Sequence, residues 1–240
     1  MIDKILYKSL NYFFPILCGM CGKEDFRSVR SGLCRICAKE TPRIWKKKGC
    51  PICSGKTTED VCDYCTSRNV FFTEARYLRE RTDLLAEVLN KIKSRHEYPL
   101  SLFLSIGAKT ALRSWGNRGI DACFLLPNSS SGRFGSFPLR PFSPMRELLS
   151  RAEKTLGLPR IDPLLKRSNS RQAGKSYADR FFHARSAWEI RPSWQGCCPS
   201  KVLLLDDVFT TGASVNEASR ILLENGTEEV YILTYLRTME

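Results

Sequence analysis

The stretch Val202–Ser214, VLLLDDVFTTGAS, joins a hydrophobic run to two adjacent acids and a turn of small residues. Its first four residues are aliphatic and have polar neighbours on both sides, which is typical of a strand buried on both faces of a parallel sheet. The segment 215–225 that follows repeats apolar residues on one side and ends before Gly226, which predicts a helix. A strand, a small-residue turn and a helix in this order predict a ligand site at the carboxyl end of the strand.

The turn has the composition of a phosphate-binding loop, formed by Thr210, Thr211, Gly212, Ala213 and Ser214. The glycine lets the backbone approach a ligand, and the surrounding N–H groups and hydroxyls can ring a phosphate at the positive end of the expected helix. The carboxylates of Asp206 and Asp207 can accept hydrogen bonds from the vicinal hydroxyls of a sugar. An acid pair can also lie in a solvated turn, but the loop and helix that follow favour a sugar-phosphate site.

The chain before this stretch alternates between strand and helix patterns. We expect strands at 71–78, 121–126, 161–165, 202–205 and 229–236, and helices at 83–94, 99–115, 145–156 and 215–225. Alternation of this kind predicts an α/β fold, with a parallel sheet covered by helices on both faces and the ligand at the carboxyl ends of the strands.

Eight of the eleven cysteines form four CxxC pairs near the amino terminus: Cys18/Cys21, Cys34/Cys37, Cys50/Cys53 and Cys62/Cys65. A two-residue gap makes a tight turn that can bring both sulfurs within roughly 2.3 Å of one zinc ion. Four such turns predict two structural four-cysteine zinc sites, most simply paired in sequence order, although interleaved pairing stays open. A redox CxxC would more naturally occur singly in a βαβ context. The small module has few apolar residues, so metal binding is expected to supply much of its folding free energy.

Composition sets limits on the class of protein. The 240 residues are 42% hydrophobic, which supports a folded core. The apolar start at 2–17 is interrupted by charged residues and a proline, so it predicts a short amphipathic helix and neither a membrane span nor a signal peptide. Without a signal peptide, the many cysteines are expected in a reducing compartment, and we therefore expect a cytoplasmic protein.

A formal net charge of +13 makes a polyanionic partner plausible. Basic residues surround an aromatic ring at Arg43, Trp45 and 46–48, and a second basic group occurs between Arg76 and Arg95. Positive charge beside an aromatic ring suits single-stranded nucleic acid, because phosphates are attracted and bases stack. The alternative is a solvated lysine-rich face between the two zinc sites.

The stretch 202–214 resembles the PRPP-binding signature of type I phosphoribosyltransferases. The order of a double zinc ribbon, an α/β segment, a QxGxS-type loop and the VLLLDDVFTTGA signature narrows the resemblance to the ComF (competence protein F, GntX-like) family, over nearly the whole chain. The resemblance implies a zinc ribbon at 1–68 and a phosphoribosyltransferase-like domain at 69–240. It also implies PRPP or a ribose 5-phosphate ligand, magnesium carried with the diphosphate, competence-machinery partners and a role in DNA uptake.

The resemblance also implies roles for individual residues. Asp206 and Asp207 match the catalytic, ribose-binding acids, and residues 210–214 match the 5-phosphate loop. The residues that match a diphosphate or lid segment are Arg140, Arg171, Gln172, Gly174, Lys175, Ser176 and Arg180. An ordinary surface loop is the alternative for the lid.

This chain departs from the family in the diphosphate region. The usual RGFNQ is replaced by a segment that keeps Arg140 and Phe142 but loses the glycine, asparagine and glutamine, and His183 replaces the usual asparagine after the lid. The two hypotheses are therefore a phosphoribosyltransferase that transfers a ribosyl group to an unknown acceptor, and a single-stranded nucleic-acid-binding competence factor whose PRPP site is regulatory or inactive.

Overall fold

A four-stranded parallel sheet forms the centre of the molecule. The computed structural model describes residues 17–24, 32–40, 49–95, 98–127, 145–167 and 187–239. The strand order is β1-β6-β5-β2, and every pairing in the sheet is parallel. The strands are β1 (Glu74–Glu80), β2 (Ala122–Leu125), β5 (Lys201–Phe209) and β6 (Glu229–Arg237). The predicted parallel α/β sheet is confirmed.

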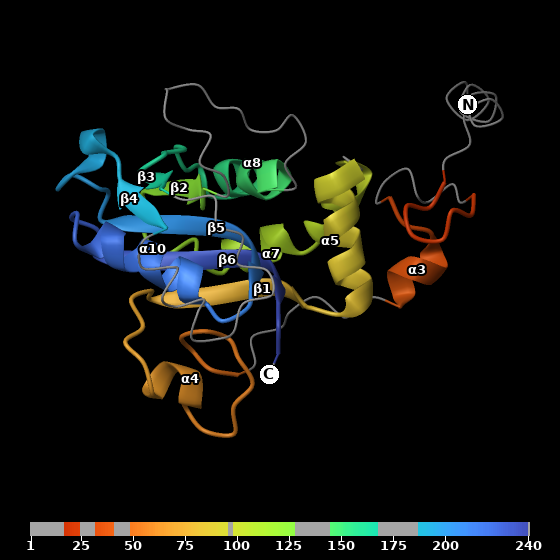
Figure 1. Ribbon diagram of the computed structural model, residues 1–240, viewed down its shortest axis with the longest axis horizontal. Coiled ribbons are helices and arrows are strands. Elements are labelled where there is room, and N and C mark those ends of the chain that lie inside the picture. The colour runs from red at the N-terminus through yellow and green to blue at the C-terminus, as the bar shows by residue number, and fades with distance from the viewer. Residues whose placement is uncertain are drawn as a thin grey trace.

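Helices cover both faces of this sheet (Figure 1). Leu203 and Leu205 of β5 pack into a core with α5 (Asp83–Arg95), α6 (Tyr98–Leu104), α7 (Ala108–Arg113) and α8 (Met145–Leu156). Val202 and Leu204 face the opposite core, which α10 (Ala213–Leu223) closes. Successive strand residues point to opposite faces, so the aliphatic run supplies both cores at once.

Most predicted elements lie close to their expected positions, and two of them differ instructively. The helix expected at 99–115 is two helices, because the chain turns after Leu104 and Gly107, with φ 93°, precedes the second helix. The strand expected at 202–205 continues to Phe209, since its ladder with β6 includes Asp206 opposite Thr234 and Phe209 opposite Arg237. The acid pair therefore lies within the strand and not in a turn after it.

A short antiparallel ribbon lies beside the main sheet. It pairs β3 (Leu164–Lys166), which overlaps the strand expected at 161–165, with β4 (Trp188–Ile190). β4 carries no strand pattern long enough to predict, and the 3-10 helix Pro192–Trp194 follows it. The indole nitrogen of Trp188 donates to the Pro127 carbonyl at 3.1 Å and ties the ribbon to the end of β2.

The two cysteine-rich segments lie at different places on the fold. The first includes α3 (Arg35–Lys39), which Figure 1 shows on the far side of α5 from the sheet, and the Lys91 ammonium of α5 donates to the Gly19 carbonyl at 2.7 Å. The second includes α4 (Asp63–Thr66), which lies below β1 in the same view. It is attached to β1 by hydrogen bonds from the Ala75 amide to the Ile52 carbonyl (2.6 Å) and from the Ser54 hydroxyl to the Ala75 carbonyl (2.8 Å).

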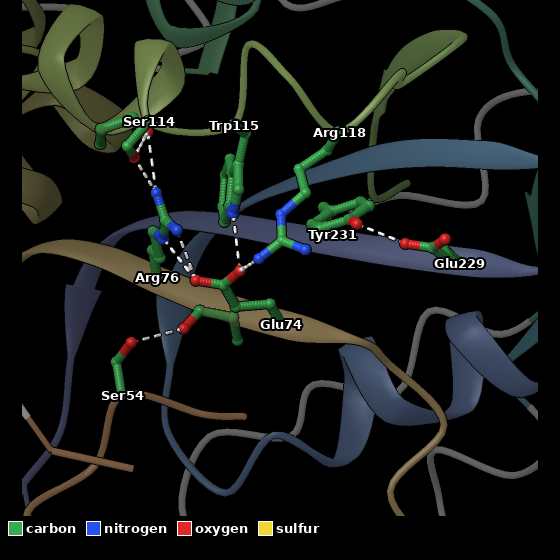
Figure 2. Close-up of polar contacts among 10 residues, drawn as sticks. Ser54, Glu74, Arg76, Ser114, Trp115, Arg118, Glu229 and Tyr231 are labelled. Carbon is green, nitrogen blue, oxygen red and sulfur yellow. Dashed lines mark hydrogen bonds and ion pairs between the residues drawn. The ribbon is translucent and has the colours of Figure 1, made fainter. Parts of the chain in front are cut away.

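A buried polar network occupies the beginning of β1 (Figure 2). The Glu74 carboxylate accepts from the Arg76 guanidinium at 2.7 Å and from the Trp115 indole at 2.9 Å, and Arg118 approaches it at 4.0 Å. Arg76 also lies 4.2 Å from the Trp115 ring centroid and bonds Ser114. Every charge of this network meets an opposite charge or a donor, which is what a buried structural ion pair requires.

Within the described ranges, each helix is too short or too polar to cross a bilayer. The amphipathic helix expected at 2–17 lies outside the described residues except for Leu17.

Candidate functional site

The acid pair lies in the carboxyl-terminal half of β5. Asp206 is 7% exposed, and the Asp207 side chain is 14% exposed. The Asp206 carboxylate accepts a hydrogen bond from the Asp207 backbone amide at 2.8 Å. A buried carboxylate with a half-buried one as its chain neighbour is costly unless positive charge or a ligand compensates it, so this part of the strand is a candidate binding position.

Lysines from two other elements supply positive charge to the acid pair. Lys93 of α5 forms an ion pair with Asp207. Lys93 and Lys166 of β3 both favour the ionised form of Asp206. Burial, with the charge of Asp207 added, nevertheless raises the pKa of Asp206 to about 8. The protein by itself therefore stabilises only part of the negative charge at this position.

The small-residue loop turns sharply into α10. Gly212 is the residue before the helix, with φ 67°, a left-handed conformation that a glycine adopts without strain. The Thr211 hydroxyl lies 3.4 Å from the Ala213 amide, while the Thr210 and Ser214 side chains are half-buried. The first turn of an eleven-residue helix and two partly accessible hydroxyls thus adjoin the acid pair in the chain.

Two aromatic side chains pack tightly against the loop at Gly212. A Cβ atom on Gly212 would lie 2.5 Å from the Tyr64 hydroxyl and 2.6 Å from Cζ of Phe209. Tyr64 belongs to α4, between Cys62 and Cys65. The glycine is therefore required both by its backbone conformation and by the close approach of two aromatic side chains.

The eight CxxC cysteines form two groups in sequence order. Within each group the four sulfurs lie within 4.8 Å of one another, and the groups are Cys18, Cys21, Cys34, Cys37 and Cys50, Cys53, Cys62, Cys65. A tetrahedral zinc with Zn–S bonds of about 2.3 Å needs sulfurs about 3.8 Å apart. The Sγ–Sγ distances of 3.8 Å for Cys21–Cys34 and 3.4 Å for Cys53–Cys62 agree with that requirement. The geometry brings together the sequential pairs and not interleaved ones.

In the second group, Cys53 favours the thiolate, whereas burial raises the pKa of Cys62 to about 11 and hydrogen bonding with Cys53 raises the pKa of Cys65. Hydrogen bonding from Cys65, together with the positive charge of Arg237, lowers the pKa of Cys53 to about 5. Thiolates are the ligands that zinc binds, so a Cys53 thiolate suits the metal site that the sulfur spacing indicates. The other three cysteines stand apart, and Cys123 is buried in β2 as its apolar setting suggests.

Several predicted residues lie outside the part of the chain that is described. These are Trp45 with its basic neighbours Arg43 and 46–48, His183, and the diphosphate or lid residues Arg140, Arg171, Gln172, Gly174, Lys175, Ser176 and Arg180. Their roles stay predictions.

Sequence reasoning overlooked four residues of the site. Lys93 was counted only as part of a basic group, and Lys166, Tyr64 and Arg237 were not assigned to the site. One available signal was the aromatic residue inside the Cys62–Cys65 pair. In the chain, Lys93 lies more than a hundred residues before Asp206, and Lys166 lies forty residues before it. Only the fold therefore brings the lysines close to the acids.

Comparison with known proteins gives two curated relatives, and no family model matches the chain. Competence protein F of Haemophilus influenzae is 33% identical over 89 residues, which cover 36% of this chain and 39% of that protein. Competence protein ComFC of Streptococcus pneumoniae is 27% identical over 131 residues, covering 50% of this chain and 56% of that protein. The chain therefore spans less than two thirds of either relative.

Two solved structures are also similar. The allosteric regulatory enzyme of purine biosynthesis matches at 17% identity and a TM-score of 0.35, over 55% of this chain and 25% of that one. The APRTase from Giardia lamblia complexed with 9-deazaadenine matches at 14% identity and a TM-score of 0.37, over 66% of this chain and 86% of that one. TM-scores of this size support no inference about ligands.

The parallel sheet with helices on both faces, the acid pair and loop on β5, and the two four-cysteine groups define an α/β protein with two candidate metal centres. The two curated relatives that the chain resembles are both competence proteins, which agrees with the ComF resemblance of the sequence.

Proposed function

We propose that the chain binds PRPP or ribose 5-phosphate at the carboxyl-terminal part of β5. The observation that carries the proposal is the buried, incompletely compensated Asp206 with the half-buried Asp207 beside it in the chain, shortly before a small-residue loop and a helix amino terminus. The carboxylates of Asp206 and Asp207 would accept hydrogen bonds from the ribose hydroxyls, and the 210–214 loop would hold the 5-phosphate. Ligand hydroxyls that donate to the acids in addition to the Lys93 ion pair would relieve the cost of burying them.

The same site supports a transferase reaction as the finer proposal. The bond from ribose C1 to the diphosphate would break, a nucleophile would form the new bond at C1, and the diphosphate would leave. Magnesium would bind with the diphosphate and neutralise its charge. Lys93 and Lys166 offer positive charge close to the acids, in a chain whose diphosphate region departs from the ComF pattern.

Isothermal titration of the full chain with Mg-PRPP, and separately with ribose 5-phosphate, tests the proposal. Asp207→Asn should weaken both ligands at least about tenfold, because hydrogen bonds to a charged acceptor are worth roughly 1.5–3 kcal/mol. Asp162→Asn is the matched control. Asp162 forms its ion pair with Arg191, at a distance of 2.6 Å, and not with a residue of the acid pair. Equal affinity of Asp207→Asn and the wild-type chain would overturn the assignment.

Two structural zinc ions form the metal part of the proposal, one in each four-cysteine group. The close spacing of the sulfurs supports it. Metal analysis of the purified chain should find two zinc ions, and Cys62→Ser should reduce the zinc content by one. Full zinc content in Cys62→Ser would contradict a site made by the second group.

A second candidate is binding of single-stranded DNA during uptake, together with competence-machinery proteins. The net charge of +13 and the similarity to two competence proteins favour it. Fluorescence anisotropy with labelled single-stranded DNA should show binding that weakens steeply with salt. Absence of binding at low salt would remove this candidate, whereas Mg-PRPP binding would be unaffected by that result.

A further inference from the structure

The second four-cysteine group and the phosphate loop are joined by three side chains. We infer that Arg237, Phe209 and Tyr64 form a positioning bridge through which the second cysteine group holds the 210–214 loop in its ligand-binding conformation. The inference rests on the proposed function for the role of the loop. The contacts of the bridge stand independently of it.

Arg237 connects the cysteine group to the end of β5. One guanidinium nitrogen donates to the Cys53 carbonyl at 2.7 Å, and the other lies 3.4 Å from the Cys53 sulfur. The same guanidinium stacks 4.5 Å from the centroid of Phe209, and the residue is buried. A Cβ on Gly55 would come within 2.7 Å of this group, so the glycine makes room for it.

Arg237 also has an electrostatic reason to stay in place. A zinc ion with four thiolates carries a net charge of about −2. A buried charge of this kind needs a nearby cation, and the guanidinium beside Cys53 supplies one. Occupied cysteines would therefore hold the arginine, and the arginine would hold the ring of Phe209.

Tyr64 makes the second connection, directly from the metal-binding segment to the loop. It lies in α4 between Cys62 and Cys65, so its backbone direction depends on the cysteine group. Its ring packs edge-on against Phe209 with centroids 6.2 Å apart, and its hydroxyl lies against Gly212. Phe209 is the last residue of β5 and also contacts Phe72 edge-on at 6.0 Å. The loop thus rests on a surface that the cysteine group positions.

The first cysteine group has a different attachment in the described part of the chain. The Gly19 carbonyl of this segment accepts a hydrogen bond from Lys91 of α5, and the buried cysteines of the group pack against the core formed with α5 to α8. The bridge therefore predicts that the two metal ions are not equivalent: loss of the second should loosen the loop, and loss of the first should affect it much less.

Hydrogen–deuterium exchange of the zinc-loaded full chain tests the bridge without any ligand. Arg237→Met and Tyr64→Leu should each speed exchange of the backbone amides of 210–214 by about tenfold. Cys62→Ser should do the same, whereas Cys21→Ser should leave that exchange within about twofold of wild type. Arg191→Met is the matched arginine control, because it removes an ion pair with Asp162 and should leave loop exchange at the wild-type rate.

Zinc content measured on each sample separates the outcomes. Faster loop exchange, with or without loss of one zinc ion, supports the bridge. Wild-type loop exchange in folded Arg237→Met and Tyr64→Leu, or in a chain that has lost the second zinc ion, overturns it. If Tyr64→Leu does not fold, Tyr64→Phe removes only the hydroxyl against Gly212 and should still speed exchange about twofold to threefold.

Ribose 5-phosphate titration distinguishes this inference from the proposed function. If the wild-type chain binds ribose 5-phosphate, Arg237→Met should weaken it about tenfold and Arg191→Met should not. A wild-type chain that binds neither ribose 5-phosphate nor Mg-PRPP defeats the proposed function, while the exchange result still decides whether the bridge exists.

Discussion

Two buried acids on the same sheet differ in how completely the protein compensates their charge. Glu74, the first residue of β1, is enclosed by Arg76, the Trp115 indole and Arg118 (Figure 2). Asp206, far along β5, accepts an amide hydrogen bond, has another carboxylate as its chain neighbour, and receives cationic help at longer range from two lysines. Both acids are buried, but only the first has contacts that match its charge.

The difference separates structure from candidate function. A carboxylate whose partners all come from the protein contributes to folding and offers nothing to a ligand. A carboxylate that burial pushes toward its protonated form has an unused capacity to accept hydrogen bonds, which a sugar hydroxyl can supply. The comparison predicts that changes at the beginning of β1 alter stability, and changes on β5 alter binding.

The largest effect is expected from Arg76→Met. Removing the guanidinium leaves the buried Glu74 carboxylate without its closest cation, and breaking a buried pair in this way costs about 3–5 kcal/mol. Urea denaturation should show a free energy of unfolding lower by that amount. Ribose 5-phosphate affinity of the remaining folded chain should be unchanged, and a variant as stable as wild type would show that the network is not structural.

A somewhat smaller effect is expected from Gly212→Ala. A left-handed alanine costs about 1–2 kcal/mol, and overpacking against Tyr64 and Phe209 adds about 1–3 kcal/mol. Gly157 is the matched control: it has φ 69°, and a Cβ there would meet no atom within 4 Å. Gly157→Ala should therefore cost only the conformational part, about 1–2 kcal/mol. Thermal or urea unfolding of both variants checks the difference, and equal losses would contradict tight packing under the loop.

Asp206→Asn is expected to stabilise the chain. Because burial raises the pKa of Asp206 to about 8 from an unfolded value near 3.8, the folded state holds a proton that the unfolded state releases. This contribution to stability is fully present below pH 3.8 and is lost as the pH rises toward 8. An asparagine side chain does not ionise, so the variant keeps the stability that the wild-type chain loses as the pH rises. Asp206→Asn should therefore raise the free energy of unfolding on the order of 2 kcal/mol at pH 8.

Urea denaturation between pH 5 and 8 measures the effect of Asp206→Asn. The wild-type chain should lose stability over this range more steeply than the variant. The same variant should bind ribose 5-phosphate less tightly, so greater stability with weaker binding is the expected combination. Parallel pH dependence of the two chains would mean that Asp206 is ionised in the fold at neutral pH.

The smallest effect on stability is expected from Lys93→Met. The Lys93 side chain is 43% exposed, and partly exposed ion pairs contribute at most about 1 kcal/mol. Its positive charge lowers the pKa of Asp206, so its removal should move that pKa further up. Carboxyl NMR titration of the variant, with Lys109→Met as a control on α7, measures the shift. An unchanged pKa would exclude Lys93 as a partner of the acid pair.

Patterns that depend on local chemistry were predictable. The aliphatic run 202–205 identified the central strand because a strand buried on both faces has no polar positions. The helix at 145–156 was placed correctly from its apolar repeat, and the CxxC spacing identified both cysteine groups. The break at Gly107 and the strand β4 were missed, because an isolated glycine and a three-residue strand carry little local signal.

The sequence by itself determined the buried strand, the acid pair, the small-residue loop and the two sets of cysteines, since each depends on residues close together in the chain. The tertiary structure decided that β5 extends through the acid pair, that Lys93 and Lys166 approach it, and that Tyr64 and Arg237 support the loop from the second cysteine group. The physical reason is that burial and charge compensation depend on distances between elements. Those distances follow from how the sheet and helices pack, which no local pattern records.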